Sequence, residues 1–340
     1  MYRPRDRGIS ILAVLFLLAF SLILTDREIP TVASQEINLQ SKGIQAPLPL
    51  TEPLSPLWDE ATLIEVPLNP QVTTQPLTPF PSIRTLTART LNNGTWIAFL
   101  LEWQDSTKDM STAKTELFRD AAALQFPTVT ELPYVCMGQA GNDINIWHWK
   151  GDWQADIEGA FSDVTDVYPN FWVNYYPFAL GEPPYSHPSS FNESKRFIAG
   201  WEAGNPLSDP ARVSSVEDLF ARGFGTLTTQ PHQDVLGWGK WNAGEWKVVF
   251  SRPLSNADRD DTQFQTGQTK PIAFAVWDGS NGEVDGKKSV STWLTLEVES
   301  PRPLAEPFVF NLPLLVLIGS IWVVSILILA FWIFLMRRKK

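Results

Sequence analysis

An apolar segment near the C-terminus, residues 312–336, contains no charged side chain and is followed directly by four basic residues, 337–340. A segment of this length and composition is typical of a transmembrane helix, and basic residues beside such a helix stay on the cytoplasmic side. Buried core helices seldom reach this length without a strongly polar residue. The sequence therefore predicts a single-pass membrane protein, with residues 312–336 as the transmembrane helix and residues 337–340 as a cytoplasmic basic tail.

The N-terminus has the pattern of an export signal. Three arginines precede an apolar run over residues 9–24, which is short for a membrane span and has the size found in signal peptides. Small residues at 32–34 offer a cleavage site, and charged residues at 26–28 leave an uncleaved anchor as the alternative. We therefore expect residues 1–34 to be a signal peptide or signal anchor. The middle of the chain then lies on the periplasmic or extracellular side of the cell membrane.

Charge and cysteine content restrict the partners and cofactors. The chain has a formal net charge of −10, and its two ends carry eight of the 27 basic residues but only three of the 37 acidic ones, so the exported part is more acidic still. Such a charge argues against nucleic acid or anionic lipid as a partner. The single cysteine, Cys136, excludes a disulfide within the chain, a covalently attached CxxCH haem, and a cysteine-rich iron–sulfur or zinc site. Any cofactor is therefore held by other ligands.

The exported part has the pattern of a β protein. Residues 85–90 and 95–103 flank Asn92-Asn93-Gly94, a strong hairpin signal, and β-branched and aromatic runs occupy residues 246–250, 272–277 and 290–298. Helix signals are few, and the best are residues 216–222 and 115–124. We predict a mainly β fold, an antiparallel β-sandwich with a few short helices.

Composition predicts the boundaries of this domain. Residues 35–78 are rich in proline and lack periodicity, so we expect a Pro-rich tether there, followed by the sandwich over residues 79–300 and a linker over residues 301–311. Residues 163–210 are dense in Tyr, Pro, Gly and Asn, and we expect them to leave the sheet and cover a site or contact a partner.

Motifs of hydrolytic and metal-dependent enzymes are absent. The sequence contains no GxSxG, HExxH or P-loop, and it has only three histidines. His187 and His232 lie in turn-like segments typical of surface histidines. His148 lies between Trp147 and Trp149, and strand alternation places it on the opposite face from both tryptophans, where we expect a structural role.

Acidic and thioether side chains offer two further possibilities. A paired-carboxylate glycosidase could be built from Glu102, Asp105, Asp109 and Asp120, but nothing in the sequence fixes their separation. Met110 and Met137 are the only methionines of the exported domain, and a thioether is a usable axial ligand of haem iron where cysteine and histidine are scarce. Met137 precedes Gly138 in a turn setting, whereas Met110 follows a polar segment. Spacing alone leaves Met137 open between core residue and ligand.

Eight short blocks occur in a fixed order: EWQDST at 102–107, FRDAAALQFP at 118–127, MG at 137–138, NIWHWK at 145–150, GFGTLT at 223–228, GEWKVVFSRPL at 244–254, AFAVWDG at 273–279 and KSVSTW at 288–293. Together they resemble the haem-binding domain of ethylbenzene dehydrogenase-type gamma subunits. The resemblance spans about residues 95–295, nearly the whole exported domain, and the ordered set is more specific than any single block.

The resemblance implies a β-sandwich that holds one non-covalent haem b, with a methionine and a lysine as iron ligands. It also implies an electron-transfer subunit that assembles with a molybdopterin catalytic subunit and an iron–sulfur subunit. Met137 matches the family methionine. Lys288 matches the block that opens the last strand, while Lys287, Lys240 and Lys247 remain alternatives for the second ligand. Because lysine coordinates iron only as a neutral amine, the site has to favour loss of its proton.

Two hypotheses of different classes follow. The first is a membrane-anchored b-type cytochrome that transfers electrons and carries no catalytic residues. It would be the gamma-like subunit of an exported molybdoenzyme of the nitrite, nitrate, chlorate or hydrocarbon-oxidising type, or would pass electrons to a cytochrome c acceptor. The alternative is a haem-free carbohydrate-binding or adhesion β-sandwich tethered to the membrane.

Overall fold

The structure is a computed structural model, and it describes residues 38–129, 137–159 and 211–303, with shorter stretches at 132–133, 168, 170, 199–205 and 208–209 and isolated residues between 320 and 336. The expected signal at 1–34, Cys136, His187 and most of the segment 163–210 lie outside the described residues. The domain is therefore described from Asn38 onward.

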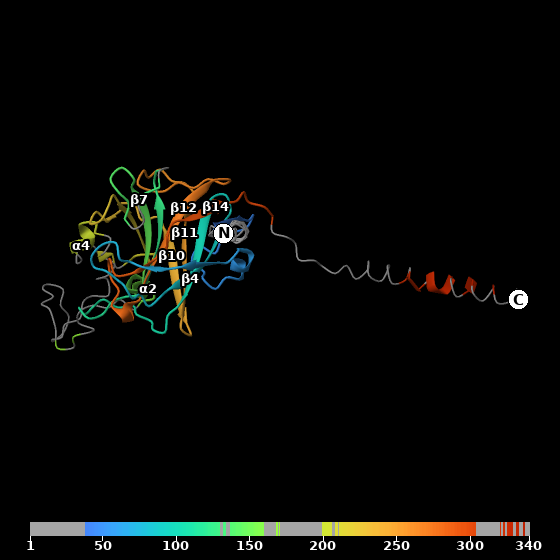
Figure 1. Cartoon of the computed structure of the whole chain (residues 1–340), viewed down its shortest axis with the longest axis horizontal. Coiled ribbons are helices and arrows are strands. Elements are labelled where there is room, and N and C mark those ends of the chain that lie inside the picture. The colour runs from blue at the N-terminus through green and yellow to red at the C-terminus, as the bar shows by residue number, and fades with distance from the viewer. Residues whose placement is uncertain are drawn as a thin grey trace, which may run out of the picture. The chain divides into compact units, whose positions relative to one another are not determined.

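Strands account for most of the regular secondary structure in the described chain (Figure 1). They are β1 (Asn38–Gly43), β2 (Ile64–Pro67), β3 (Asn69–Pro70), β4 (Thr85–Asn92), β5 (Trp96–Gln104), β6 (Ala121–Pro127), β7 (Ile144–Lys150), β8 (Val216–Ala221), β9 (Thr228–Thr229), β10 (Leu236–Asn242), β11 (Glu245–Pro253), β12 (Thr269–Trp277), β13 (Ser289–Val290) and β14 (Leu294–Val298). Short helices are η1 (Pro56–Glu60), α2 (Gly151–Ile157), α4 (Ala199–Glu202) and η5 (Gly279–Asn281). This confirms the prediction of a mainly β fold with few helices.

The strands form one hydrogen-bonded path in the order β10-β11-β5-β4-β1-β14-β12-β6-β7-β8-β9. Neighbours pair antiparallel except β1, which lies parallel to both β4 and β14. The sheet is therefore mixed, and the predicted antiparallel arrangement holds for the neighbouring strands of this path except at β1. The prediction of a tether over residues 35–78 is wrong from Asn38 onward, because this segment contributes three strands, β1, β2 and β3, to the sheet.

Strand β1 is hard to recognise in the sequence because it buries few apolar side chains. Its alternating pattern turns Leu39, Ser41 and Gly43 inward, and only the first of these is a large apolar residue. Gly43 is required by a close backbone approach, because a Cβ there would lie 2.5 Å from the carbonyl carbon of Ser300. Polar pairing and backbone contact, rather than hydrophobicity, thus place β1 between its neighbours.

Aromatic contacts between strands that are not hydrogen-bonded neighbours show that the sheet folds back into two facing layers. Phe99 of β5 lies with its ring centroid 5.8 Å from those of Phe126 of β6 and Trp147 of β7. Trp149 of β7 contacts Trp246 of β11 at 4.8 Å. All five side chains are fully buried. This aromatic core therefore lies between a layer containing β5 and β11 and a layer containing β6 and β7, as in a sandwich.

Both predicted helices are wrong. Residues 216–222 form strand β8, and residues 115–124 run through a loop into strand β6. The VEDLFAR segment has good helix formers, but Glu217 and Asp218 are almost fully buried by pairing with β7 and by side-chain partners. Tertiary burial of these two acids overrides the local helix propensity.

In the part of the chain that is described, no helix has the length and apolar character needed to cross a membrane. Most of residues 312–336 lie outside that part, so the transmembrane helix stays a prediction.

The aromatic core gives a direct test of the two-layer packing. Phe126→Ala removes a fully buried ring that contacts Phe99, Trp147 and Phe264, so we expect the free energy of unfolding to fall by about 3–5 kcal/mol. Phe80 is the matched control, because its side chain is 82% exposed and Phe80→Ala should change stability by no more than about 0.5 kcal/mol. Urea unfolding followed by tryptophan fluorescence measures both. Equal losses in the two variants would contradict the assignment of the core.

Candidate functional site

A cavity of about 420 Å³ lies on the face of the β12-β6-β7-β8 layer that points away from the aromatic core. Its floor comes from alternate residues of these strands, including Ala123, Ile146 and Ala275, whereas Phe126 and Trp147 point the other way into the core. Loops form the walls, from residues 71–76, 118–119, 224–227 and 283–288. The layer is therefore two-sided, with a packed core on one face and a cavity on the other.

Alanines make room for the cavity. Ala121 and Ala123 of β6 lie beside Ala275 and Trp277 of β12, and Ala123 is also paired with His148 of β7. Ala273 adds a further small side chain to the floor. Larger apolar residues at these inward positions would fill the space, since protein interiors are otherwise packed with few voids. Small side chains on two adjacent strands thus leave the space that the cavity occupies.

A tight turn holds Met137 at the cavity. Gly138 follows it with φ of 71°, and a Cβ there would lie 2.8 Å from the carbonyl oxygen of Asn142. Gln139 and Asn142 exchange backbone hydrogen bonds of 3.2 and 2.8 Å that close the turn. Met137 itself is half-buried and lines the cavity. The sequence prediction singled out this methionine, and the structure places it in the cavity wall.

Lys288 lies in the cavity wall, at the end of the loop that connects β12 to β13. Its Nζ atom is 4.9 Å from the ring centroid of Trp277, and its side chain is half-buried, whereas Lys287 is exposed. Ser289 fixes the next position, because its Oγ donates a 2.6 Å hydrogen bond to the carbonyl oxygen of Ile83. Lys288 therefore faces the cavity while its neighbour faces solvent.

The other two alternative lysines, Lys240 and Lys247, do not line the cavity. Lys240 is exposed on β10, and its register partner on β11 is Lys247. The ammonium group of Lys247 pairs with the carboxylate of Glu102 and lies 3.3 Å from that of Glu245. These carboxylate partners raise the pKa of Lys247 against the effect of partial burial. Neither lysine meets the geometric requirement for a ligand at this cavity.

His148 also lines the cavity, which sequence reasoning did not foresee. Its ring stacks on Trp277 with centroids 4.8 Å apart, and it lies on the face opposite Trp147 and Trp149, as strand alternation predicts. Its Nε2 atom is buried and neither accepts nor donates a hydrogen bond. Burial, followed by the charge of Lys150, holds the pKa of His148 well below its ordinary value. The imidazole is therefore neutral at pH 7.

Other wall residues had no role assigned to them from the sequence. Phe118 and Arg119 precede β6, and the guanidinium of Arg119 lies 2.6 Å from the carboxylate of Asp152. Gln71, in the segment expected to be a tether, is almost fully buried and donates a 2.7 Å hydrogen bond to the carbonyl oxygen of Gly286. Long-range contacts of this kind leave no local signal in the sequence.

Adjacent alanines on β6 test the existence of the cavity. Ala123→Leu places extra atoms in the cavity, so we expect the free energy of unfolding of the cofactor-free protein to change by less than about 1 kcal/mol. Ala122→Leu is the matched variant, because Ala122 is fully buried on the opposite, close-packed face and the change should cost about 1–3 kcal/mol. Chemical denaturation of both proteins measures the difference. The reverse order of stability would mean that the two faces have been misassigned.

Comparison with known proteins identifies a family. The family model described as ethylbenzene dehydrogenase matches residues 55–289. A respiratory nitrate reductase heme subunit (ORF7) of Haloferax mediterranei is 26% identical over 76% of this chain and 71% of its own length. The chlorate reductase gamma subunit of Ideonella dechloratans is 26% identical over 70% of this chain and 75% of its own length. One is named as the heme subunit and the other as the gamma subunit of a reductase, in agreement with the predicted electron-transfer role in place of a catalytic one.

Among solved structures, a family 9 carbohydrate-binding module from Caldicellulosiruptor kristjanssonii in complex with glucose aligns with 80% of this chain and 100% of its own. The TM-score is 0.36 and the identity is 8%. A likeness this distant carries no conclusion about what the chain binds.

Proposed function

Since the chain belongs to the ethylbenzene dehydrogenase family, we propose that it is a membrane-anchored b-type cytochrome that transfers electrons as the gamma-like subunit of an exported molybdoenzyme. The observation that carries this proposal is that Met137 and Lys288, far apart in the sequence, line one cavity. The names of the two relatives, a heme subunit and a gamma subunit, support it further. Their reductases act on different substrates, so the partner enzyme is proposed only as nitrite-, nitrate-, chlorate- or hydrocarbon-converting.

The residues of the cavity fit a flat and largely apolar cofactor such as haem b. Its volume of about 420 Å³ falls within the range of about 300–1,000 Å³ that is usual for cofactor sites. The alanine floor and the rings of Phe118, Phe224 and Trp277 supply apolar contacts. Arg119 in the wall supplies a cation for an anionic substituent of the cofactor. The protein would hold the group without a covalent bond, since its single cysteine excludes a CxxCH attachment.

Met137 and Lys288 are the proposed axial ligands. The thioether of Met137 binds iron without losing a proton, whereas the amine of Lys288 has to be neutral to do so. Because the metal and a proton compete for the same nitrogen, binding should weaken as the pH falls. His148 is a third donor in the same cavity and is neutral, so it is the internal competitor that the experiments have to exclude.

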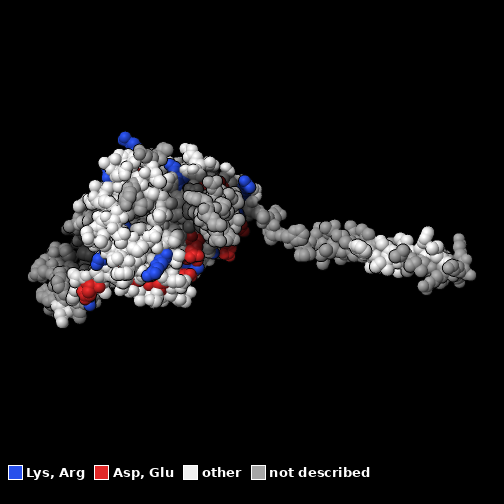
Figure 2. All heavy atoms as spheres, in the orientation of Figure 1, with Lys and Arg blue, Asp and Glu red and all other residues white. Residues whose placement is uncertain are grey.

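With its iron held by Met137 and Lys288, a bound haem would supply one-electron transfer and would leave no place for a substrate. The chain's own part is then to exclude water with the loops around the cavity and to keep both ligands fixed by the turn at Gly138 and by the anchored Ser289. The proposed partners are a molybdopterin subunit with an iron–sulfur subunit, or a cytochrome c acceptor. Acidic and basic side chains are interspersed on the face shown in Figure 2, so charge there does not single out a partner surface.

The proposed location is the cell membrane, with the β domain on the periplasmic or extracellular side. The support is the uncharged run at residues 312–336, the basic residues at 337–340 and the export signal at the N-terminus. Anchoring would confine electron transfer to acceptors near the membrane surface.

Absorption spectra of the haem-loaded protein test the ligands. We expect Met137→Ala and Lys288→Ala each to lose the low-spin spectrum at neutral pH, because each removes one axial donor. Met110→Ala and Lys287→Ala are the matched controls and should keep it, because Met110 does not line the cavity and Lys287 is exposed. In the unsubstituted protein, acid should convert the low-spin form to a high-spin form as the Lys288 amine takes up its proton.

His148→Ala distinguishes the competing ligand, and it should retain the low-spin spectrum. Loss of that spectrum in His148→Ala together with its retention in Lys288→Ala would make the histidine the ligand. A purified protein that takes up no haem, and so has a featureless visible spectrum, would refute the proposed function and favour the haem-free carbohydrate-binding or adhesion alternative.

Membrane anchoring has its own test. We expect the full chain to sediment with membranes and to resist alkaline carbonate extraction, because the apolar run would be buried in the bilayer. A chain that ends before residue 307 should appear in the soluble fraction if the N-terminal signal is cleaved. Recovery of the full chain in the soluble fraction would contradict the proposed anchor.

A further inference from the structure

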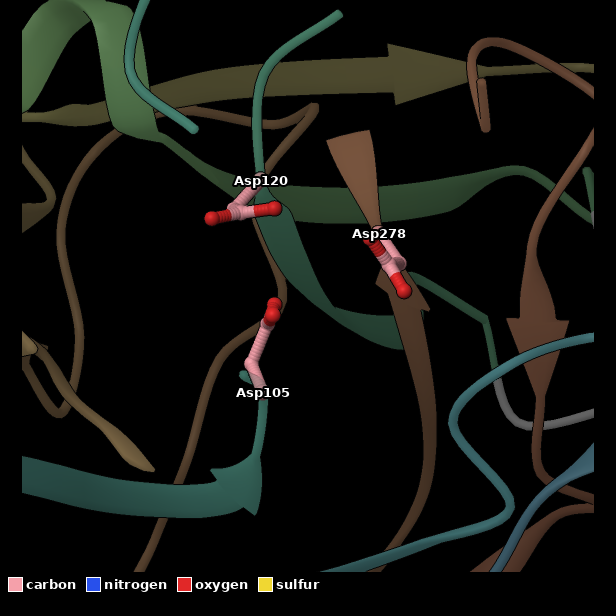
Figure 3. Close-up of side chains that lie close together, drawn as sticks. All are labelled: Asp105, Asp120 and Asp278. Carbon is pink, nitrogen blue, oxygen red and sulfur yellow. The ribbon is translucent and has the colours of Figure 1, made fainter. Parts of the chain in front are cut away.

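Three aspartates meet outside the cavity, at the ends of three strands (Figure 3). Asp105 follows β5, Asp120 precedes β6 and Asp278 follows β12. One carboxylate oxygen of each lies within 4.8 Å of the others, and the residues are only 6%, 0% and 7% exposed. Figure 3 shows the side chain of Asp105 directed toward that of Asp120. Segments far apart in the sequence thus converge on one buried anionic point.

Nothing among the described residues neutralises this charge. None of the ion pairs between described residues involves Asp105, Asp120 or Asp278. Burial, and then the charge of Asp105, raises the pKa of Asp120 to about 7, and burial together with the charges of Asp278 and Asp109 raises that of Asp105. Buried carboxylates normally have a cationic partner or a bound metal, because desolvating an unpaired charge is costly. The cluster therefore lacks a counter-charge.

An unpartnered oxygen points to what is missing. The Oδ2 atom of Asp105 is buried and makes no hydrogen bond, although its Oδ1 atom accepts from the backbone nitrogen and hydroxyl of Thr107 at 3.0 and 3.1 Å. Asp109, next to the cluster, also has a buried Oδ2 atom with no hydrogen bond. In the ionised carboxylate both atoms can only accept, so a neighbouring cation would satisfy them.

The remaining oxygens are held in place by the protein. Asp120 accepts hydrogen bonds from the backbone nitrogen of Asp109 at 2.7 Å, from the indole nitrogen of Trp246 at 3.0 Å and from the backbone nitrogen of Gly279 at 2.9 Å. Asp278 accepts from the hydroxyl of Ser280 at 2.7 Å. These bonds come from three segments of the chain and fix the carboxylates independently of any ligand.

We propose that Asp105, Asp120 and Asp278 bind a divalent cation of the Ca²⁺ type. The donors are all oxygens, which hard cations prefer, and neither a nitrogen nor a sulfur ligand is present in the cluster. Ca²⁺–oxygen bonds of about 2.3–2.6 Å allow ligands of one ion to lie up to about 5 Å apart, which accommodates the observed separation of 4.8 Å or less. This inference does not depend on haem binding.

The cation would join the parts of the chain that build the cavity. Phe118 and Arg119 immediately precede Asp120, while the loop after Asp278 continues through residues 283–286 to Lys288. Gly279, beside the cluster, packs so closely on Phe118 that a Cβ would lie 2.2 Å from its carbonyl oxygen. A bound ion would therefore stabilise the two walls of the cavity against each other.

Binding can be measured on the full chain after treatment with EGTA. Terbium serves as the Ca²⁺ probe. Trp246 is hydrogen-bonded to Asp120, so its indole is close enough to sensitise the luminescence of a terbium ion bound there. We expect a saturable signal that Ca²⁺ displaces, and an increase in the unfolding temperature when Ca²⁺ is added. Asp105→Asn and Asp278→Asn should each weaken binding by more than about tenfold and abolish the Ca²⁺-dependent shift.

Two control variants locate the site. Asp59→Asn replaces an exposed carboxylate and should bind Ca²⁺ normally. Asp234 belongs to a second acidic cluster, with Asp218 and Asp261. Arg252 lies 3.1 Å from Asp261 and already supplies a counter-charge there. The Asp234→Asn variant should therefore also bind Ca²⁺ normally. Binding lost in Asp234→Asn and retained in both cluster variants would overturn the assignment. The absence of saturable, Ca²⁺-displaceable binding to the unsubstituted protein would overturn it whether or not the variants fold.

Discussion

The architecture depends on the period of two in strands β12, β6 and β7. Even-numbered positions of β6, such as Phe126, point into the aromatic core, and odd-numbered positions, such as Ala123, face the cavity. A shift of one residue in the pairing of β6 would exchange these faces and bury the cavity residues in the core. The core therefore does more than stabilise the domain, because its tight packing fixes the register that keeps the alanine face open for a ligand.

Buried charges fall into two kinds in this protein. Lys150 and Glu217, paired on β7 and β8, form an ion pair with each side chain about 5% exposed, and Arg252 lies 3.1 Å from Asp261 in a site that is almost fully buried. Breaking such pairs is costly because one charge would remain without a partner. The cluster of Asp105, Asp120 and Asp278 differs because none of its carboxylates forms an ion pair with a described residue. Asp218 and Glu283 are also buried without an ion pair among the described residues, so what sets the aspartate cluster apart is the convergence of three carboxylates without an ion pair, together with the unpartnered Oδ2 atom of Asp105.

The sequence predicted those features that follow from local period or from ordered blocks. Alternation in NIWHWK correctly separates His148 from its tryptophan neighbours, and the blocks led to Met137 and Lys288, which the structure brings to one cavity. It did not predict β1, whose place in the sheet rests on long-range pairing and on the close approach at Gly43. It also misread residues 216–222 as a helix, because the partners that bury Glu217 lie far away along the chain.

The cavity and the aspartate cluster were missed as assemblies for one physical reason. Gln71 closes one wall through a hydrogen bond to a residue more than two hundred positions away, and Asp105 meets Asp278 across a comparable distance. Gln71 was predicted to be part of a tether, and Asp105 was considered only for a paired-carboxylate site whose separation the sequence does not fix. Burial changes the energetic requirement of an acidic side chain, because a carboxylate in water needs no partner and a carboxylate in the interior does. The loop between β5 and β6 and the loop after β12 therefore have two roles, because they close the cavity and also hold the carboxylates. A cation shared by both loops would serve the two roles with one interaction.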